Sequence, residues 1–508
     1  MGDSRIGKVW KKVGKYIVLY LFLIFMYILF DKKAWNYNTK FVQVLMWMAI
    51  GVSVVGLVYW KRWKNNEKST GDYVIWGIFA LGFILRIGYC MYTPWYLRQH
   101  DVGAVKITDT GHAAYILYLF NGKLPSSNTY QFYHPPFFHF CAAVTLHIIG
   151  FLEGEPIAAK LIEGSKMVSC FATCAMLWQV KSLFQEMGLK KHALYIAMGC
   201  VAVFPYFFLA SATINNDALA LLFLVLAFRY TLKWYQDKSW KNLLVVALAY
   251  GFGMMTKSSC GIMAIFTALV MFYVGIRAIK AGNLVFYIKQ YLLFALVSFP
   301  LGLWFAIRNY IKFGQSFHYV YKLETSLPLW CGDHSFRERF LPHFDQIFTS
   351  HIYCDAAADY NVFAYAMKSA LMGEYSYTDS RYAAYFLVLL GGLFFVTSLF
   401  AMIYVTLKQH SFVWVSLLVS WGLQILSFIT FNVKYPFGCT MDYRYIPFTT
   451  IVASAMLAKF WEYLHVYNKN TALTMPSILS QIAEFFLSLL LVLFAMICVY
   501  FYCTLKAA

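Results

Sequence analysis

The sequence predicts an all-α polytopic membrane protein, with about 13 transmembrane helices and juxtamembrane helices in two long outer loops. Three observations predict this fold. The 508-residue chain is 61% hydrophobic and only 13% charged, whereas soluble domains carry about 25% charged residues. Apolar runs of about 18–25 residues, long enough to cross a bilayer, recur along the chain. The basic residues behind the net charge of +19 lie in short loops between these runs, where we expect them to orient the protein and contact lipid headgroups rather than nucleic acid.

The first two spans are predicted at about 16–30 and 41–60, and they form an N-terminal extension, residues 1–70. The basic residues Lys8, Lys11, Lys12 and Lys15 precede the first span. Because basic segments stay on the cytoplasmic side, the N-terminus is predicted to be cytoplasmic. The third span, at about 73–92, then crosses outward.

The apolar run at about 135–151 admits two topologies. It begins with two prolines, is about 17 residues long and contains His139 and His147, so it is marginal as a span. If it crossed the membrane, every later basic loop would change side. We expect a juxtamembrane helix on the outer surface instead, so that residues 93–157 form one long outer loop.

With this choice, the basic loops of the remaining chain alternate consistently between the two sides. Further spans are predicted at about 157–180, 193–211, 217–235, 242–256, 259–277, 286–305, 381–407, 411–431, 444–463 and 479–504. The last of them forms a C-terminal segment, residues 465–508. A second long outer loop, residues 308–379, contains Cys331 and Cys354, which could form a disulfide in an oxidising compartment.

The predicted topology gathers ionisable residues at the outer membrane boundary: Asp101, His134, Asp217, Lys257, Arg308 and Arg444. Singly, each has a structural explanation, since a basic residue at a span end can snorkel to the interface and Asp217 can cap a helix. Together, cations facing a carboxylate suit a substrate whose phosphate lies at the headgroup level and whose tail stays in lipid. A nearby carboxylate could then act as general base towards an attacking hydroxyl.

Six motifs in order carry a family resemblance. They are the outer-loop acidic residue Asp101, His134-Pro135-Pro136, Asp217 at the head of a span, Thr256-Lys257, Trp304 to Asn309 followed by Phe313-Gly314, and Arg444-Tyr445-Ile446-Pro447. With these motifs the chain resembles the GT-C glycosyltransferases that use polyprenyl-phosphate-linked sugars. The most similar branch comprises the protein O-mannosyltransferases and the lipid A aminoarabinose transferases. The resemblance covers most of residues 73–460.

The resemblance implies that residues 71–464 form a GT-C-like catalytic domain, which transfers a sugar from a polyprenyl-phosphate donor to an acceptor hydroxyl with inversion. Asp101 would be the catalytic base, and Lys257 and Arg308 would hold the donor phosphate. The other residues assigned to substrate binding are His112, His134, Asp217, Arg444 and Tyr445.

The first site departs from the family pattern, which often has Asp-Glu, because His100 and Val102 flank the acidic residue here. Asp109, eight positions after Asp101, competes for the role of base. Three histidines near Asp101 could bind a divalent metal, but their loop-like spacing lacks the i, i+4 pairing of a helical site. No metal or other cofactor is therefore expected besides the sugar donor.

By the same resemblance, the partners are a lipid-linked sugar donor, a protein, glycan or lipid acceptor, and membrane lipids, but not nucleic acid. Such an enzyme is expected in the plasma membrane, or in the endoplasmic reticulum membrane of a eukaryote. The alternative function is a transporter or flippase for a lipid-linked sugar, which would place ionisable residues at mid-membrane. Arg86 and Arg229 lie within predicted spans and leave this alternative open.

Overall fold

The computed structural model of the chain describes residues 5–31, 70–99, 101–103, 110–317, 319–343, 345–348, 353–375, 377, 381–471 and 475–504. Within these ranges the regular secondary structure is helical, apart from one isolated bridge between Trp330 and Phe437. The fold is therefore all-α, as predicted.

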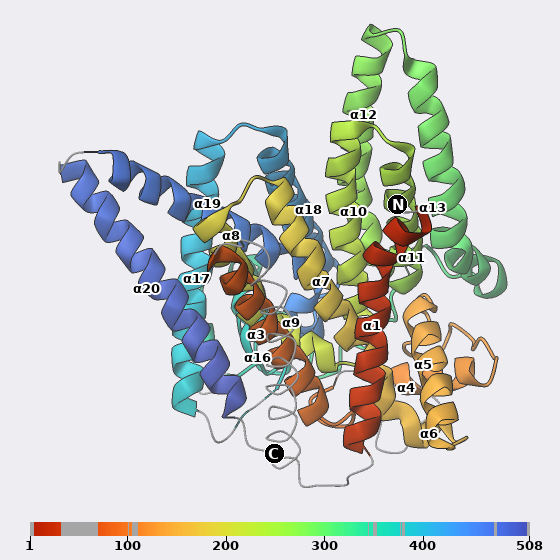
Figure 1. The fold of residues 1–508 in the computed structure, drawn as a ribbon. Coiled ribbons are helices and arrows are strands. Elements are labelled where there is room, and N and C mark those ends of the chain that lie inside the picture. The colour runs from red at the N-terminus through yellow and green to blue at the C-terminus, as the bar shows by residue number, and fades with distance from the viewer. Residues whose placement is uncertain are drawn as a thin grey trace.

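Long helices run up and down through a bundle (Figure 1). They are α1 (Arg5–Asp31), α3 (Thr70–Tyr92), α7 (Lys166–Glu186), α8 (Lys191–Val203), α10 (Asp217–Asp237), α11 (Trp240–Thr256), α12 (Ile262–Lys280), α13 (Leu284–Phe313), α17 (Arg381–Lys408), α18 (Phe412–Lys434), α19 (Phe448–Asn470) and α20 (Met475–Cys503). Apart from the one at about 193–211, each predicted span within the described ranges overlaps a helical segment, whereas the predicted span at about 41–60 lies outside the described residues. Among the helices described, eight are long and apolar enough to cross a membrane, or nine if one bent pair counts as a single span.

The bent pair corrects the predicted continuous span at 193–211. Here α8 ends at Val203, and α9 (Pro205–Leu209) continues at an angle of 52°, because Pro205 cannot donate a backbone hydrogen bond. Arg86 compensates for the break, since its guanidinium donates to the carbonyl oxygens of Ala202 at 2.9 Å and Val201 at 3.1 Å. Arg86, which lies within a span, thus provides hydrogen-bond donors for two backbone carbonyl groups at the C-terminal end of α8.

The second mid-span arginine is also part of a structural network. Arg229 on α10 pairs with Glu186 at 2.5 Å and donates to Gln179 at 2.5 Å, and both partners lie on α7. Lys233 joins the same carboxylate at 3.1 Å. These contacts tie α7 to α10 and give Arg229 a counter-ion within the bundle.

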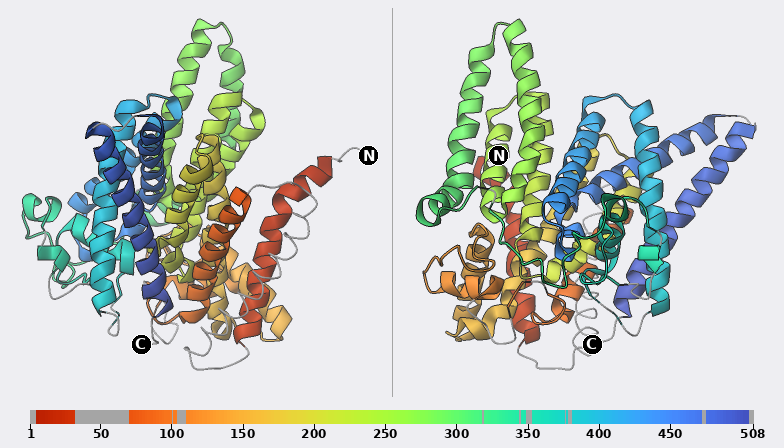
Figure 2. Two further views of the ribbon diagram at one scale, coloured as in Figure 1. Left: turned by 60° about the vertical axis from the view of Figure 1, so that its left-hand side comes forward. Right: turned by 180° about the vertical axis from the view of Figure 1, so that it is seen from behind.

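Short helices gather at one end of the bundle, which we call the site end. They are α4 (Gly111–Phe120), α5 (Phe137–Glu153), α6 (Ala158–Leu161), α9, η2 (Ala210–Ala212), α14 (Phe336–Phe340), α15 (Asp345–Phe348), α16 (Val362–Met372) and η6 (Tyr443–Tyr445). All views place α4, α5 and α6 at the end opposite the turn between α12 and α13 (Figures 1 and 2). α5 has 17 residues, as does α11, and is one of the shorter apolar helices, so its juxtamembrane position stays a prediction.

Candidate active site at one end of the bundle

Asp101 is fixed to the start of α4 through the backbone. The N–H of His112 donates to the carbonyl of Asp101 at 2.8 Å, and the N–H of Ala113 donates to Val102 at 3.0 Å. Gly111 permits this approach, because its φ is +91° and a Cβ there would lie 2.7 Å from the carbonyl oxygen of Val102. Asp101 itself has a φ of 57°, a conformation that aspartate tolerates better than most residues. The chain therefore holds Asp101 and His112 side by side.

The carboxylate of Asp101 has two partners from distant segments. The hydroxyl of Tyr130 donates to its Oδ1 at 2.5 Å, and a guanidinium nitrogen of Arg444 lies 3.6 Å from its Oδ2. The carboxylate remains about one-quarter exposed. It is thus oriented by a hydroxyl and a cation while one side stays accessible.

Arg444 lies in η6, just before α19, between two carboxylates. Asp442 accepts from the backbone N–H of Arg444 at 2.9 Å and lies 3.9 Å from its Nε, whereas Asp101 approaches the other end of the guanidinium. Burial opposes the charge, but Tyr445, Asp442 and Asp101 together raise the pKa of Arg444 well above its usual value. Arg444 is a permanent cation at the centre of the site.

Lys257 and Asp217 form an ion pair beside Arg444. Their side chains are 12% and 7% exposed, respectively, so the pair is largely shielded from water. Asn216 brings the two together, because its side-chain amide donates at 2.8 Å to the carbonyl of Thr256, the residue before Lys257. The Lys257 ammonium also lies 4.8 Å from the ring centroid of Tyr445.

Three histidine rings stack on one another next to these charged residues. The ring of His112 lies 5.7 Å from that of His134 and 5.1 Å from that of His139, and its Nδ1 is 2.8 Å from Nε2 of His139. Burial lowers the pKa of His112 to about 4, against the opposing effect of Asp101 and Asp217. Burial also lowers the pKa values of His134 and His139 well below the usual value. All three imidazoles are therefore neutral at physiological pH.

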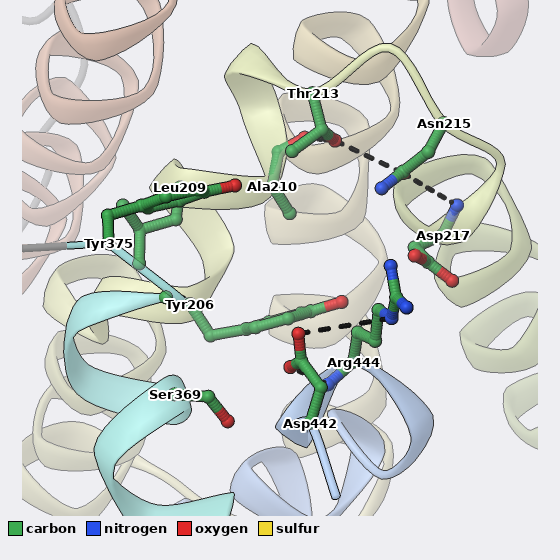
Figure 3. A pocket seen from close by; sticks show the side chains of 11 residues that line it. Tyr206, Leu209, Ala210, Thr213, Asn215, Asp217, Ser369, Tyr375, Asp442 and Arg444 are labelled. Carbon is green, nitrogen blue, oxygen red and sulfur yellow. Dashed lines mark hydrogen bonds and ion pairs between the residues drawn. The ribbon is translucent and has the colours of Figure 1, made fainter. Parts of the chain in front are cut away.

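A small, partly open cavity lies beside Arg444 (Figure 3). It is lined by Tyr206, Leu209, Ala210, Thr213, Asn215, Asp217, Ser369, Gly373, Tyr375, Asp442 and Arg444. These residues come from α9, η2, the start of α10, α16, the segment after it, and η6. The cavity therefore borders both ion pairs of the site.

The structure brings most of the predicted site residues together: Asp101, His112, His134, Asp217, Lys257, Arg444 and Tyr445. It does not place Arg308 with them. Arg308 donates to the carbonyl of Pro125 at 3.1 Å and to Asn309 at 2.8 Å, and contacts none of these residues. Asp109 and His100 lie outside the described residues.

Several residues that line or support the site were not predicted: Tyr130, His139, Tyr206, Asn215 and Asp442. Two of them had a usable signal in the sequence, because Asn215 and Asp442 stand two residues from Asp217 and Arg444. Cys331 and Cys354 are both free thiols, so the possible disulfide between them is not formed. Among the residues that the structure describes, no group of three or more His, Cys, Asp or Glu side chains is arranged to hold a metal ion.

Comparison with known proteins supports the predicted family resemblance. Residues 133–304, about a third of the chain, match the family described as dolichyl-phosphate-mannose-protein mannosyltransferase. The matched segment contains His134, Asp217 and Lys257. It confirms the predicted resemblance to the GT-C glycosyltransferases and supports glycosyltransferase activity. No curated protein matches the chain.

Two solved structures are similar to this fold. One is the Archaeoglobus fulgidus oligosaccharyltransferase in its apo form, with 11% identity, a TM-score of 0.48, and coverage of 85% of this chain and 56% of that chain. The other is the archaeal oligosaccharyltransferase AglB from Archaeoglobus fulgidus in complex with an inhibitory peptide and a dolichol-phosphate, with 11% identity, a TM-score of 0.46, and coverage of 88% and 57%. The chain thus spans little more than half the length of either relative.

Proposed function

We propose that this protein is a membrane glycosyltransferase that moves a sugar from a polyprenyl-phosphate donor to an acceptor hydroxyl at the outer membrane face. One observation carries the proposal: the carboxylate of Asp101 and two cations, Arg444 and Lys257, converge at the same end of the helix bundle. Phosphate at the headgroup level would meet these cations while the prenyl tail remains in lipid. The matched family, which uses dolichyl-phosphate mannose and acts on protein, supports the same donor class.

The reaction is a single displacement with inversion. Asp101 accepts the proton of the acceptor hydroxyl as its oxygen attacks the anomeric carbon of the sugar. The bond between that carbon and the phosphate oxygen breaks, and its electron pair leaves with the lipid phosphate. Lys257 and Arg444 stabilise the charge of the leaving phosphate, and the proton on Asp101 passes to water.

Both cations are already paired with carboxylates before the donor binds. Lys257 holds Asp217, and Arg444 holds Asp101 and Asp442. These pairs orient the cations in a shielded site, so a phosphate group can replace one carboxylate partner without reorganisation of the backbone. Arg308, which contacts the loop at Pro125 instead, has no role in this step.

The proposal has a direct test. The purified protein is reconstituted in lipid nanodiscs with dolichyl-phosphate mannose, labelled in the sugar, and a peptide that contains serine and threonine. We expect label on the peptide, and a loss of at least about 100-fold in Asp101→Asn, because general-base catalysis contributes about 10²–10⁴-fold. Asp333→Asn is the matched control, since Asp333 is exposed in the second long loop.

Normal turnover by Asp101→Asn would overturn the assignment of the base, and Asp109 would be tested next. Transport of the intact donor without transfer would favour the flippase alternative. No observation favours that alternative at present, because the mid-span arginines that left it open are both engaged in structural contacts: Arg86 with α8 and Arg229 with Glu186.

A further inference from the structure

The segment that carries Asp101 contains two residues in the left-handed backbone conformation. Arg98 has a φ of 53° and Asp101 has a φ of 57°. Residues other than glycine rarely adopt this conformation, and aspartate tolerates it better than arginine does. Such residues persist only where the surrounding structure holds them in place, so we expect firm contacts between this segment and the rest of the bundle.

Gln99, which lies between these two residues, makes such a contact at two points. Its side-chain amide donates to the carbonyl oxygen of Ala212 at 2.6 Å, and its side-chain oxygen accepts from the backbone N–H of Ile214 at 3.0 Å. The two partners lie 113 and 115 residues further along the chain. Because one amide uses a donor and an acceptor at the same time, it fixes both the distance and the orientation of the Asp101 segment relative to residues 212–214.

Arg98 adds a contact on another side of the same segment. Its guanidinium carbon lies 5.5 Å from the ring centroid of Tyr92 and 5.5 Å from that of Tyr377. These cation–π contacts stabilise the segment, but they are less directional than a pair of hydrogen bonds. Gln99 is therefore the residue that aligns this segment with residues 212–214.

Residues 212–214 lead directly to Asp217 through a short, hydrogen-bonded turn. The hydroxyl of Thr213 donates to the side-chain oxygen of Asn215 at 3.1 Å, and the same oxygen accepts from the N–H of Asp217 at 3.1 Å (Figure 3). The turn is thus held by its own side chains from the point where Gln99 binds it to the start of α10.

The end of this turn is connected in the same way to the proposed phosphate-binding cation. The side chain of Asn216 donates to the carbonyl of Thr256 at 2.8 Å, and the next residue, Lys257, pairs with Asp217. Hydrogen bonds and short stretches of chain therefore connect Gln99 to Lys257 without interruption.

We propose that Gln99 is a positioning residue, which sets the place of the base Asp101 relative to the Lys257 cation. The inference rests on the proposed function, and it adds a residue that touches neither the substrate nor the reacting atoms. In a displacement with inversion, the base and the leaving phosphate act on opposite sides of the anomeric carbon, so the rate depends on their relative position. A misplacement of about 1 Å can cost about 100-fold in rate.

The test measures kcat and KM of Gln99→Met in nanodiscs, with dolichyl-phosphate mannose as donor and a peptide that contains serine and threonine as acceptor. Methionine keeps the length of the side chain and removes both hydrogen bonds. We expect kcat to fall about ten- to 100-fold. The KM for the donor should stay within about twofold of the wild-type value, because both cations are retained.

Gln290→Met is the matched control. Gln290 is fully buried and also bridges two partners, since its oxygen accepts from the indole of Trp234 at 2.8 Å and its amide donates to the carbonyl of Lys238 at 2.7 Å. These contacts join α13 to the C-terminal end of α10, whereas Asp217 lies at the other end of that helix. We expect this variant to lose at least as much thermal stability as Gln99→Met, while the kcat of the folded protein remains that of the wild type.

A second measurement makes the test independent of stability. In the Asp101→Asn background, Gln99→Met should cause no further loss of the residual rate, because the base that Gln99 positions is already absent. If Gln99 acted only on stability, its substitution would lower the rate by the same factor in both backgrounds.

The outcomes separate this inference from the function on which it rests. If the wild type transfers mannose and Gln99→Met loses no more kcat than Gln290→Met, the positioning role is overturned while the transferase proposal stands. An equal loss in the wild-type and Asp101→Asn backgrounds, or a rise in the donor KM at unchanged kcat, would also overturn it. If the wild type transfers no sugar, the proposed function itself fails, and the role of Gln99 falls with it.

Discussion

Nδ1 of His112 lies 2.8 Å from Nε2 of His139, so that one imidazole donates and the other accepts at the centre of the site end. This contact requires at least one neutral ring. Since burial holds the pKa of His112 at about 4, compared with 6.5 for an ordinary histidine, the folded state keeps His112 neutral where the unfolded chain would be protonated. The pair therefore couples the stability of the site to pH.

The first prediction is a loss of stability in weak acid. Above pH 6.5, neutral His112 makes its full contribution to the free energy of unfolding. This contribution is lost as pH falls from about 6.5 to about 4, because only the unfolded chain takes up the proton in that range. The loss is on the order of 3 kcal/mol for His112 alone. We expect the thermal unfolding midpoint of the purified protein to fall between pH 7 and pH 5, and to fall less in His112→Gln.

His147 provides the control for this measurement. It also joins α5 to α4, since its ring stacks 3.8 Å from Phe120 and its Nε2 lies 3.1 Å from the carbonyl of Phe120, but it is exposed. His147→Gln should keep the pH dependence of the wild type. An unchanged pH dependence in His112→Gln would show that other groups cause the acid sensitivity.

The second prediction separates stability from activity at the Lys257–Asp217 pair. Lys257→Met leaves the carboxylate of Asp217 buried without its cation, which should lower the free energy of unfolding by about 3–5 kcal/mol. Adding Asp217→Asn removes the unpaired charge and should restore most of the stability. Neither variant should transfer sugar, because both lack the cation proposed to hold the phosphate. Measurable transfer by the stable double variant would rule out that role for Lys257.

The third prediction concerns the orientation of the base. Tyr130→Phe removes the hydroxyl that donates to Asp101 at 2.5 Å, and hydrogen bonds to charged groups contribute about 1.5–3 kcal/mol. We expect kcat to fall about tenfold or more while the KM for the donor stays unchanged, since the cations are untouched. Tyr321→Phe is the control, because Tyr321 packs 5.4 Å from Tyr130 and is partly exposed. Equal rates for both variants would contradict the prediction.

The sequence was sufficient to predict that Asp217 and Lys257 lie at the same end of the bundle. Asp217 begins α10 and Lys257 follows α11, so two antiparallel neighbours joined by a short turn bring residues 40 positions apart to the same end. Alternation of basic loops predicts such an arrangement without any tertiary information. The family resemblance added which of these residues to consider together.

The sequence did not predict which residues contact one another within that end of the bundle. Arg308 lies near the C-terminus of α13, at the same end of the bundle as the other predicted site residues. However, α13 is a peripheral helix, and only 22% of its apolar 18-residue stretch is buried. Hydropathy gives the depth of a residue in the membrane and not its distance from the bundle axis. Asp442 was missed for a different reason, since an acidic residue near an arginine in sequence is usually a local pair, and only the fold shows that it lines a cavity.

The last prediction concerns topology, because the proposed donor is accessible only if the site end faces outward. Glu155 follows α5 at the site end, and α7 leads from there to Lys190, which is exposed near the start of α8 at the opposite end. Single cysteines at these two positions, in a background without the 11 native cysteines, are probed in intact cells with a membrane-impermeant thiol reagent. We expect labelling of Glu155→Cys and none of Lys190→Cys, since the basic loops should remain in the cytoplasm.

Both positions should react after permeabilisation, which controls for accessibility in the fold. Protection of Glu155→Cys with labelling of Lys190→Cys would place Asp101, Asp217, Lys257 and Arg444 on the cytoplasmic side, and transfer at the outer face would be excluded.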